Sequence, residues 1–126
     1  ILVEIAPGEL IDKITILDIK MERINDADKR QNVSIERDTL IAARDNSVQP
    51  SAELSNLTVA LKTVNETLWD IEDDIRDCER ASEFGDAFVE LARSVYITND
   101  KRAALKRDIN DLLGSRLVEE KSYAAY

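Results

Sequence analysis

The sequence contains no histidine, one cysteine, three glycines and two prolines. Without histidine the chain lacks the commonest general base and transition-metal ligand, so any chemistry must use carboxylates, lysine or arginine. The single cysteine, Cys78, allows no disulfide within the chain and is typical of a reducing compartment. No apolar run approaches the roughly 18 residues of a membrane span, and the N-terminal segment lacks a basic signal-peptide region. We therefore expect a cytoplasmic protein without a membrane partner.

Acidic residues outnumber basic ones by 26 to 17, which gives a formal charge of −9. Such a charge repels phosphate backbones. The one basic run, KRAALKR at residues 101–107, is too short to reverse this, and basic residues near the C-terminal end of a helix are also favoured by the helix dipole. We expect no nucleic-acid partner. A length of 126 residues is that of a single domain, here residues 1–126.

The few glycines and prolines stand where helices would begin or end, which predicts an all-α protein. A first helix is expected at about residues 8–25, and its apolar seam is spaced 4, 3, 4 and 3 along Leu10, Ile14, Leu17, Met21 and Ile24. Ile16 and Ile19 lie roughly opposite this seam, so this helix is either central in the bundle or faces a second subunit. A short helix capped by Ser34 is expected at about residues 34–46.

The strongest periodicity predicts two long helices, at about residues 52–80 and 84–113. Each carries a seam of unbroken heptad-like spacing. The seam of the first is Leu54, Leu57, Leu61, Val64, Leu68, Ile71, Ile75 and Cys78, and that of the second is Phe84, Phe88, Leu91, Val95, Thr98, Arg102, Leu105, Ile109 and Leu112. Ser51 is a plausible N-cap for the first. A short connection between them predicts an antiparallel hairpin, along which the first helix packs in a helical bundle. The sequence TND at residues 98–100 resembles a cap, but the heptad phase passes through it unchanged and favours one continuous helix.

Seven carboxylates crowd residues 66–80, and all of them lie off the predicted seam. We interpret this stretch as a solvated helix face and predict no metal or cofactor. The alternative is a magnesium site similar to that of all-α nucleotide phosphohydrolases of the MazG type, which use paired acidic motifs. Its candidates would be Asp70, Asp73, Asp77 and Glu83, with Asp86 nearby.

A polar layer is predicted midway along the hairpin, where Thr98 and Arg102 interrupt the apolar seam. The hairpin register brings Asn99 near Asn65, and a buried Arg102 needs a carboxylate or carbonyl partner. One interpretation is that the layer fixes register or oligomeric state. The other is a small-anion site walled by Trp69 and Tyr96, weakly similar to the basic pockets of chorismate mutases.

Four stretches that cover nearly the whole chain are PGELIDKITILDIKMERI, NETLWDIEDDIRDCER, FVELARSVYITNDKRAALKRDINDLLGS and VEEKSYAAY. Together they resemble a family of small bacterial, proteobacterial proteins known only as a domain of unknown function. The resemblance implies a stand-alone all-helical protein and supplies no activity, ligand or catalytic residue.

These observations favour interaction or scaffolding through helical surfaces. We predict a homodimer formed through Ile16 and Ile19, because a narrow hairpin makes a poor core alone, and a protein partner is also compatible with the sequence. The competing class is an enzyme, either a magnesium-dependent phosphohydrolase or a small-anion-binding catalyst that uses Arg102. After Gly114 the tail either folds back through Leu117, Tyr123 or Tyr126, or frays.

Overall fold

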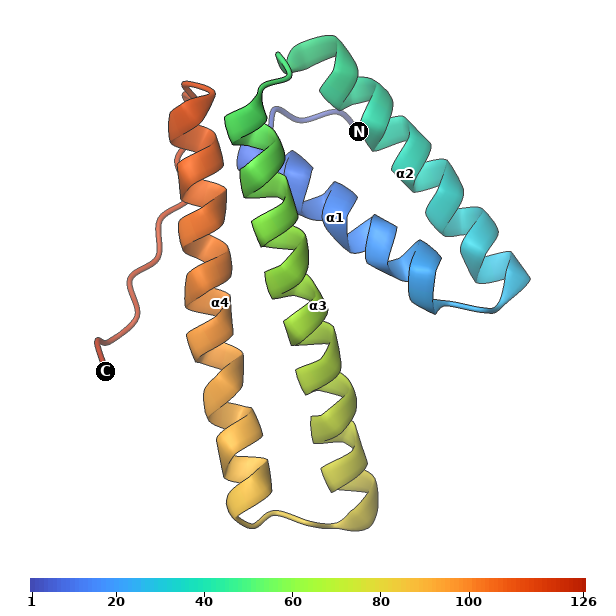
Figure 1. The fold of residues 1–126 in the computed structure, drawn as a ribbon, viewed down its shortest axis with the longest axis vertical. Helices are drawn as coiled ribbons and strands as arrows, with labels where there is room; N and C mark the ends of the chain where they lie inside the picture. The colour runs from blue at the N-terminus through green and yellow to red at the C-terminus, as the bar shows by residue number, and fades with distance from the viewer.

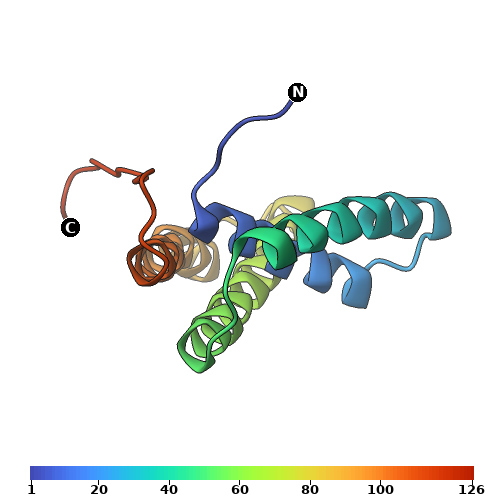
Figure 2. The same ribbon diagram turned by 90° about the horizontal axis from the view of Figure 1, so that it is seen from above.

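The protein consists of four α-helices and contains no strand, in a computed structural model that describes residues 1–126 (Figure 1). The helices are α1 (Pro7–Arg23), α2 (Ala27–Ser47), α3 (Ala52–Ala81) and α4 (Asp86–Leu112). The predicted all-α class is therefore confirmed. Figure 2 shows that the segments before α1 and after α4 leave the helical body without forming a helix.

Local chemistry sets the ends of α3. The Ser51 side chain accepts a hydrogen bond from the N–H of Leu54 at 3.1 Å, which caps the first turn. At the other end Ser82 adopts a left-handed φ of 54°. The N–H of Glu83 then reaches the carbonyl oxygen of Cys78 at 2.9 Å, a helix end of the Schellman type. The chain turns there toward α4.

Helix α2 is longer than the sequence suggested, and the predicted cap at Ser34 is wrong. Asp26 is the cap, and its carboxylate accepts from the N–H of Lys29 at 2.9 Å. The polar segment after Asp26 looked like a loop because it lacks apolar periodicity. An exposed helix needs little periodicity, and Val33 is the only buried residue of α2.

Helices α3 and α4 lie side by side, and α4 runs unbroken through residues 98–100 (Figure 1). The main apolar cluster gathers where α1 meets them and consists of Ile11, Leu54, Leu61 and Ile109. Both ends of the predicted α4 seam are exposed instead, Phe84 by 53% and Leu112 by 39%. Phe84 precedes the start of α4 and packs edge-on against Phe88, with ring centroids 5.3 Å apart.

Helix α1 is central, because it contacts α2, α3 and α4, whereas α2 contacts α1 alone. Ile19, predicted to face a second subunit, is only 1% exposed within the single chain. It lies one turn after Thr15, whose side chain contacts α3, so this face of α1 is turned to the hairpin. The predicted subunit contact at Ile19 is therefore covered by the chain itself. None of the four helices combines the length and apolar character needed to cross a membrane.

Candidate functional site

A buried carboxylate, Asp12 of α1, is the centre of the polar layer between α1 and the hairpin. It is 0% exposed. Nε of Arg102 donates to its Oδ1 at 3.0 Å, and a second guanidinium nitrogen of Arg102 donates to Oδ2. Nδ2 of Asn65 donates to Oδ1 at 2.9 Å and to Oγ1 of Thr15 at 3.0 Å. The layer thus ties all three of these helices together through one acid.

The six residues predicted for the polar layer do not gather at one place. Asn65 and Arg102 meet at Asp12, which supplies the carboxylate that a buried arginine requires. Thr98 is buried, and Asn99 and Tyr96 line a surface groove along α4 that Arg102 also lines. Trp69 stands apart, with the Arg23 guanidinium 5.9 Å from its ring centroid.

A second set of contacts continues the polar layer along α4 at intervals of one turn. Nζ of Lys106 lies 2.8 Å from a carboxylate oxygen of Glu9, and Oδ1 of Asn110 accepts from the N–H of Gly8 at 2.7 Å. A β-carbon added at Gly8 would lie 2.4 Å from the carbonyl oxygen of Lys106. We call these contacts of Arg102, Lys106 and Asn110 with α1 the ladder. It was not predicted from the sequence, although the three residues recur every four positions.

Lys106 is the most buried cation of this ladder and has two acidic partners. Its side chain is 8% exposed and lies 2.8 Å from Glu9 and 2.8 Å from Glu119 of the C-terminal tail, residues 115–126. Burial lowers the pKa of Lys106, but the hydrogen bonds to Glu119 and Glu9 outweigh it and raise the pKa above its ordinary value. Lys106 therefore stays charged and joins α1, α4 and the tail.

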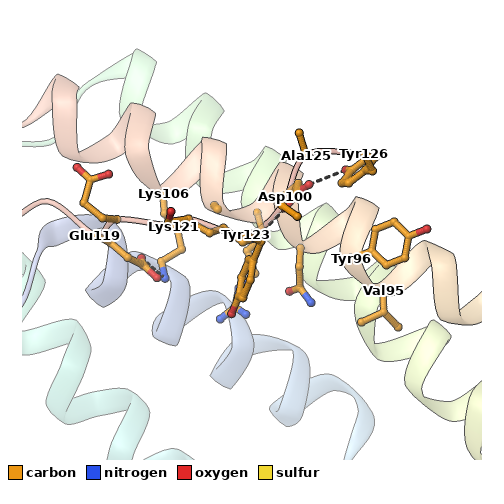
Figure 3. A pocket seen from close by; sticks show the side chains of 15 residues that line it. Val95, Tyr96, Asp100, Lys106, Glu119, Lys121, Tyr123, Ala125 and Tyr126 are labelled. Carbon is orange, nitrogen blue, oxygen red and sulfur yellow. Dashed lines mark hydrogen bonds and ion pairs between the residues drawn. The ribbon is translucent and has the colours of Figure 1, made fainter.

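An open groove of about 1010 Å³ runs between α4 and the C-terminal tail (Figure 3). One wall belongs to α4 and includes Tyr96, Asn99, Arg102 and Ala103; the other wall is residues 119–126. Its charges are three cations and three acids: Arg102, Lys106, Lys121, Asp100, Glu119 and Glu120. The groove is thus electrically balanced, and opposite charges face each other across it.

The tail is held against α4 through side chains. Oδ1 of Asp100 lies 2.7 Å from Nζ of Lys121, and its Oδ2 accepts from the Tyr126 hydroxyl at 2.5 Å (Figure 3). These two hydrogen bonds hold the pKa of Asp100 below its usual value, and Asp100 in turn raises the pKa of the Tyr126 phenol. The rings of Tyr126 and Tyr96 are 5.2 Å apart. Asp100 is therefore the main polar anchor of the tail's last residues.

The acidic stretch of α3 is largely engaged with arginine. Asp70 pairs with Arg23 at 2.5 Å and Asp77 with Arg80 at 2.7 Å. Asp73 and Glu83 are exposed. No three Asp, Glu or Cys side chains anywhere in the protein converge closely enough to hold a metal ion. Two of the four magnesium candidates are thus paired with arginine, and the other two are exposed to solvent.

The chain matches a family described as "Family of unknown function (DUF6165)" over residues 1–126. No curated protein matches it, and neither does any solved structure. The match agrees with the resemblance carried by the four sequence stretches. It brings no substrate, ligand or partner, so the function has to be argued from the geometry of the chain.

Proposed function

Since the chain belongs to this family of unknown function, we propose from its own geometry that it is an interaction module. The proposed binding surface is the face of α4 that lines the groove. Its ligand is a peptide segment of a partner protein. This is the scaffolding class favoured by the sequence, now with a specific surface.

One observation carries the proposal: this face of α4 already holds an extended peptide segment. Lys106 contacts Glu119, Asp100 contacts Lys121 and Tyr126, and Tyr96 packs on Tyr126. A helix surface that presents a cation, an anion and an aromatic ring in sequence has the elements by which peptides are recognised.

The hydrogen bonding of the polar layer also supports a binding role over a catalytic one. No buried side-chain nitrogen or oxygen lacks a hydrogen-bond partner. Arg102 and Asp12 are paired with each other, and Lys106 lies between two acids. The groups that an anion-binding catalyst would use are thus engaged in joining α1 to α4. Their arrangement is that of a framework which fixes helix register.

The size of the exposed surface supports a partner as well. The chain exposes 8587 Å², whereas a compact monomer of 14.2 kDa exposes about 6,800 Å². The excess of about 1,800 Å² on this one chain is about twice the roughly 800 Å² that each partner contributes to a specific protein interface. A second copy of the chain is one partner of this kind, and the homodimer expected from the sequence belongs here as a proposal. Its contact would have to avoid the covered Ile19.

Photo-crosslinking at two adjacent alanines tests the proposal. Ala103 lines the groove, whereas Ala104 is exposed and does not line it. With p-benzoylphenylalanine at either position of the full chain in its native cells, we expect defined adducts from position 103 only. Mass spectrometry then identifies the partner, or a second copy. Equal adducts from both positions, or none from position 103, would refute the proposal.

The magnesium-dependent enzyme makes a different prediction for the same protein. It requires several free carboxylates that face one cavity, and Asp70 and Asp77 are instead held by arginine. We expect no change in melting temperature when Mg²⁺ or nucleotides are added. A ligand present at a hundred times its dissociation constant would raise stability by about 2.7 kcal/mol. A shift of that size would favour the enzyme.

A further inference from the structure

We infer that α4 recognises an extended segment with the side-chain pattern of the chain's own tail: a glutamate, a lysine two residues later and a tyrosine five residues after that. In the tail these are Glu119, Lys121 and Tyr126. The inference rests on the proposed function, because it names the partner segment of the same surface. The tail then occupies the site until such a segment replaces it.

The order of charges on α4 sets the pattern and its direction. Lys106 binds Glu119, and Asp100, six residues earlier on α4, binds Lys121 and Tyr126. The tail therefore runs antiparallel to α4. Six helical residues span about 9 Å, and two extended residues span about 7 Å. An extended segment can thus place a carboxylate and an ammonium group on Lys106 and Asp100 at once, as Figure 3 shows for the tail.

The same charges exclude a segment with the reverse order. A lysine at the position of Glu119 would face Lys106, whose side chain is 8% exposed, and like charges at a poorly solvated site repel strongly. An acid at the position of Lys121 would likewise face Asp100. Tyr96 adds an aromatic contact beyond Asp100, where Tyr126 now lies. The surface therefore distinguishes both the order of charges and the aromatic end.

The tail is held in a way that permits exchange. Beyond Ser115 its backbone makes no backbone hydrogen bond. Tyr123 and Tyr126 are 84% and 79% exposed. The open groove separates much of the tail from α4 (Figure 3). When the tail leaves, Lys106 keeps Glu9 as a partner and Asp100 is solvated, so no buried charge is left unpaired.

A tail-derived peptide tests the inference on the full chain. The probe is a fluorescent peptide of residues 118–126, VEEKSYAAY. In the intact protein the tail competes at a high effective concentration, so the peptide should bind poorly. The double variant Lys121→Ala/Tyr126→Ala weakens the tail's own attachment. We expect it to bind the peptide about tenfold more tightly than the natural chain, measured by fluorescence anisotropy.

Two controls make the result specific. Adding Asp100→Asn to the double variant should remove most of the gain, with far-UV circular dichroism to verify its fold. A peptide with Glu119 and Lys121 exchanged, VKEESYAAY, should bind at least tenfold more weakly than the natural peptide. Equal binding of the two peptides, or no gain in the double variant, would overturn the inference.

The outcomes also separate this inference from the proposed function. Crosslinked partners at position 103 without any binding of the tail peptide would overturn the inference alone, because α4 would then recognise a segment of other chemistry. Loss of both results would overturn both. Two results together would support the proposed function and this inference. They are binding of the tail peptide, and adducts at position 103 with a partner that carries the glutamate, lysine and tyrosine pattern.

Discussion

Asp12 shows how one side chain can join three helices. It is the only acid of the chain that is fully buried, and it accepts hydrogen bonds from Arg102 of α4 and Asn65 of α3. A buried carboxylate is stable only where charge and hydrogen bonds replace water. The position of α1 on the hairpin is thus fixed by polar groups as much as by apolar ones.

Removing the charge of Asp12 should destabilise the protein. In Asp12→Asn, Arg102 loses its counter-charge, and because Arg102 is 30% exposed we expect a loss of about 2 kcal/mol, below the range for fully buried pairs. Urea unfolding followed by circular dichroism measures it. Asp73→Asn, at an exposed site without an ion pair, should change stability by less than about 0.5 kcal/mol. Equal effects of the two substitutions would contradict the role of Asp12.

The same contact changes the effect expected of Arg102→Leu. If Arg102 only interrupted an apolar seam, replacing it by leucine would leave the stability of the protein unchanged or raise it. In the structure it would leave Asp12 buried without its charged partner, so we now expect destabilisation. The difference arises because the partner of Arg102 lies 90 residues away on α1.

Gly8 permits a close approach of α1 to α4. In Gly8→Ala the new β-carbon would lie 2.4 Å from a backbone oxygen of Lys106. We expect a loss of about 1–3 kcal/mol, because backbone atoms must move apart. Gly85→Ala is the matched control, since nothing lies within 4 Å of its β-carbon. Thermal unfolding of both variants measures the difference, and a loss no larger in Gly8→Ala would disprove the tight approach.

At the scale of elements, α2 depends on its cap more than the other helices do. It buries one residue and packs on α1 alone, so tertiary contacts contribute little to it. Asp26→Ala should cost about 1 kcal/mol, because the N–H of Lys29 loses its acceptor. Ser34→Ala lies inside the helix and should cost nothing or stabilise slightly. Helicity and urea unfolding of the two variants measure the difference. A larger loss of stability in Ser34→Ala than in Asp26→Ala would show that Ser34 is the cap after all.

The attachment of the tail should depend on pH at both extremes. The folded-state pKa of Asp100 is lowered by Lys121 and Tyr126, so its contribution is complete above the ordinary value of about 3.9 and is lost as the pH falls through the lowered pKa. The pKa of Tyr126 is raised by Asp100, so its contribution is lost as the pH rises above about 10 through the raised pKa.

Nuclear magnetic resonance of the Tyr126 ring measures both transitions. In Asp100→Asn, the acid transition of Tyr126 should disappear and its phenol should ionise at lower pH than in the natural chain. Unchanged titration of Tyr126 in this variant would show that Asp100 does not hold the tail.

At the scale of the whole molecule, stability should be uneven along the hairpin. Helices α3 and α4 continue past the end of α1 as an arm of two helices (Figure 1). The main apolar cluster lies at the opposite end, around Leu61 and Ile109. Arm residues such as Ile75 and Phe88 are only half-buried. Local opening requires the least free energy where few buried contacts are lost.

Hydrogen exchange measures this gradient directly. We expect the amides of residues 74–93 to exchange faster than those of residues 54–68, under conditions in which the protein stays folded. Uniform protection along α3 and α4 would mean that something covers the arm in solution. A second copy of the chain would do so, and light scattering at the same concentration would detect it.

Much of the fold could be predicted from periodicity, because the buried face of a helix is formed by apolar residues three or four positions apart in the sequence. Every predicted seam position from Leu54 to Cys78 is buried or half-buried. The prediction weakened where this signal is absent. Helix α2 is mostly exposed, so it has no continuous row of apolar residues. Phe84 lies in the connection between α3 and α4, so its place in the heptad spacing does not make it buried.

The candidate site was predictable only in part. Arg102 could be recognised from the sequence because it is a charged residue at a position of the apolar seam, and its need for a carboxylate partner followed from electrostatics. Which carboxylate it would meet did not follow, since 26 acids were available. Lys106 and Asn110 were missed because each looks like an ordinary surface residue until α1 is packed against it. Asp12 was missed for the same reason.

The sequence by itself determined the helical class, the apolar periodicity of the long helices and the strongly acidic character, because these depend on residues close together in the chain. Only the tertiary structure decided that the polar face of α1 turns toward the hairpin, that Asp12 meets Arg102, and that the tail lies along α4. Asp12 and Arg102, for example, are 90 positions apart in the chain. The energies of such contacts depend on burial and on the direction of single atoms, which no local pattern records.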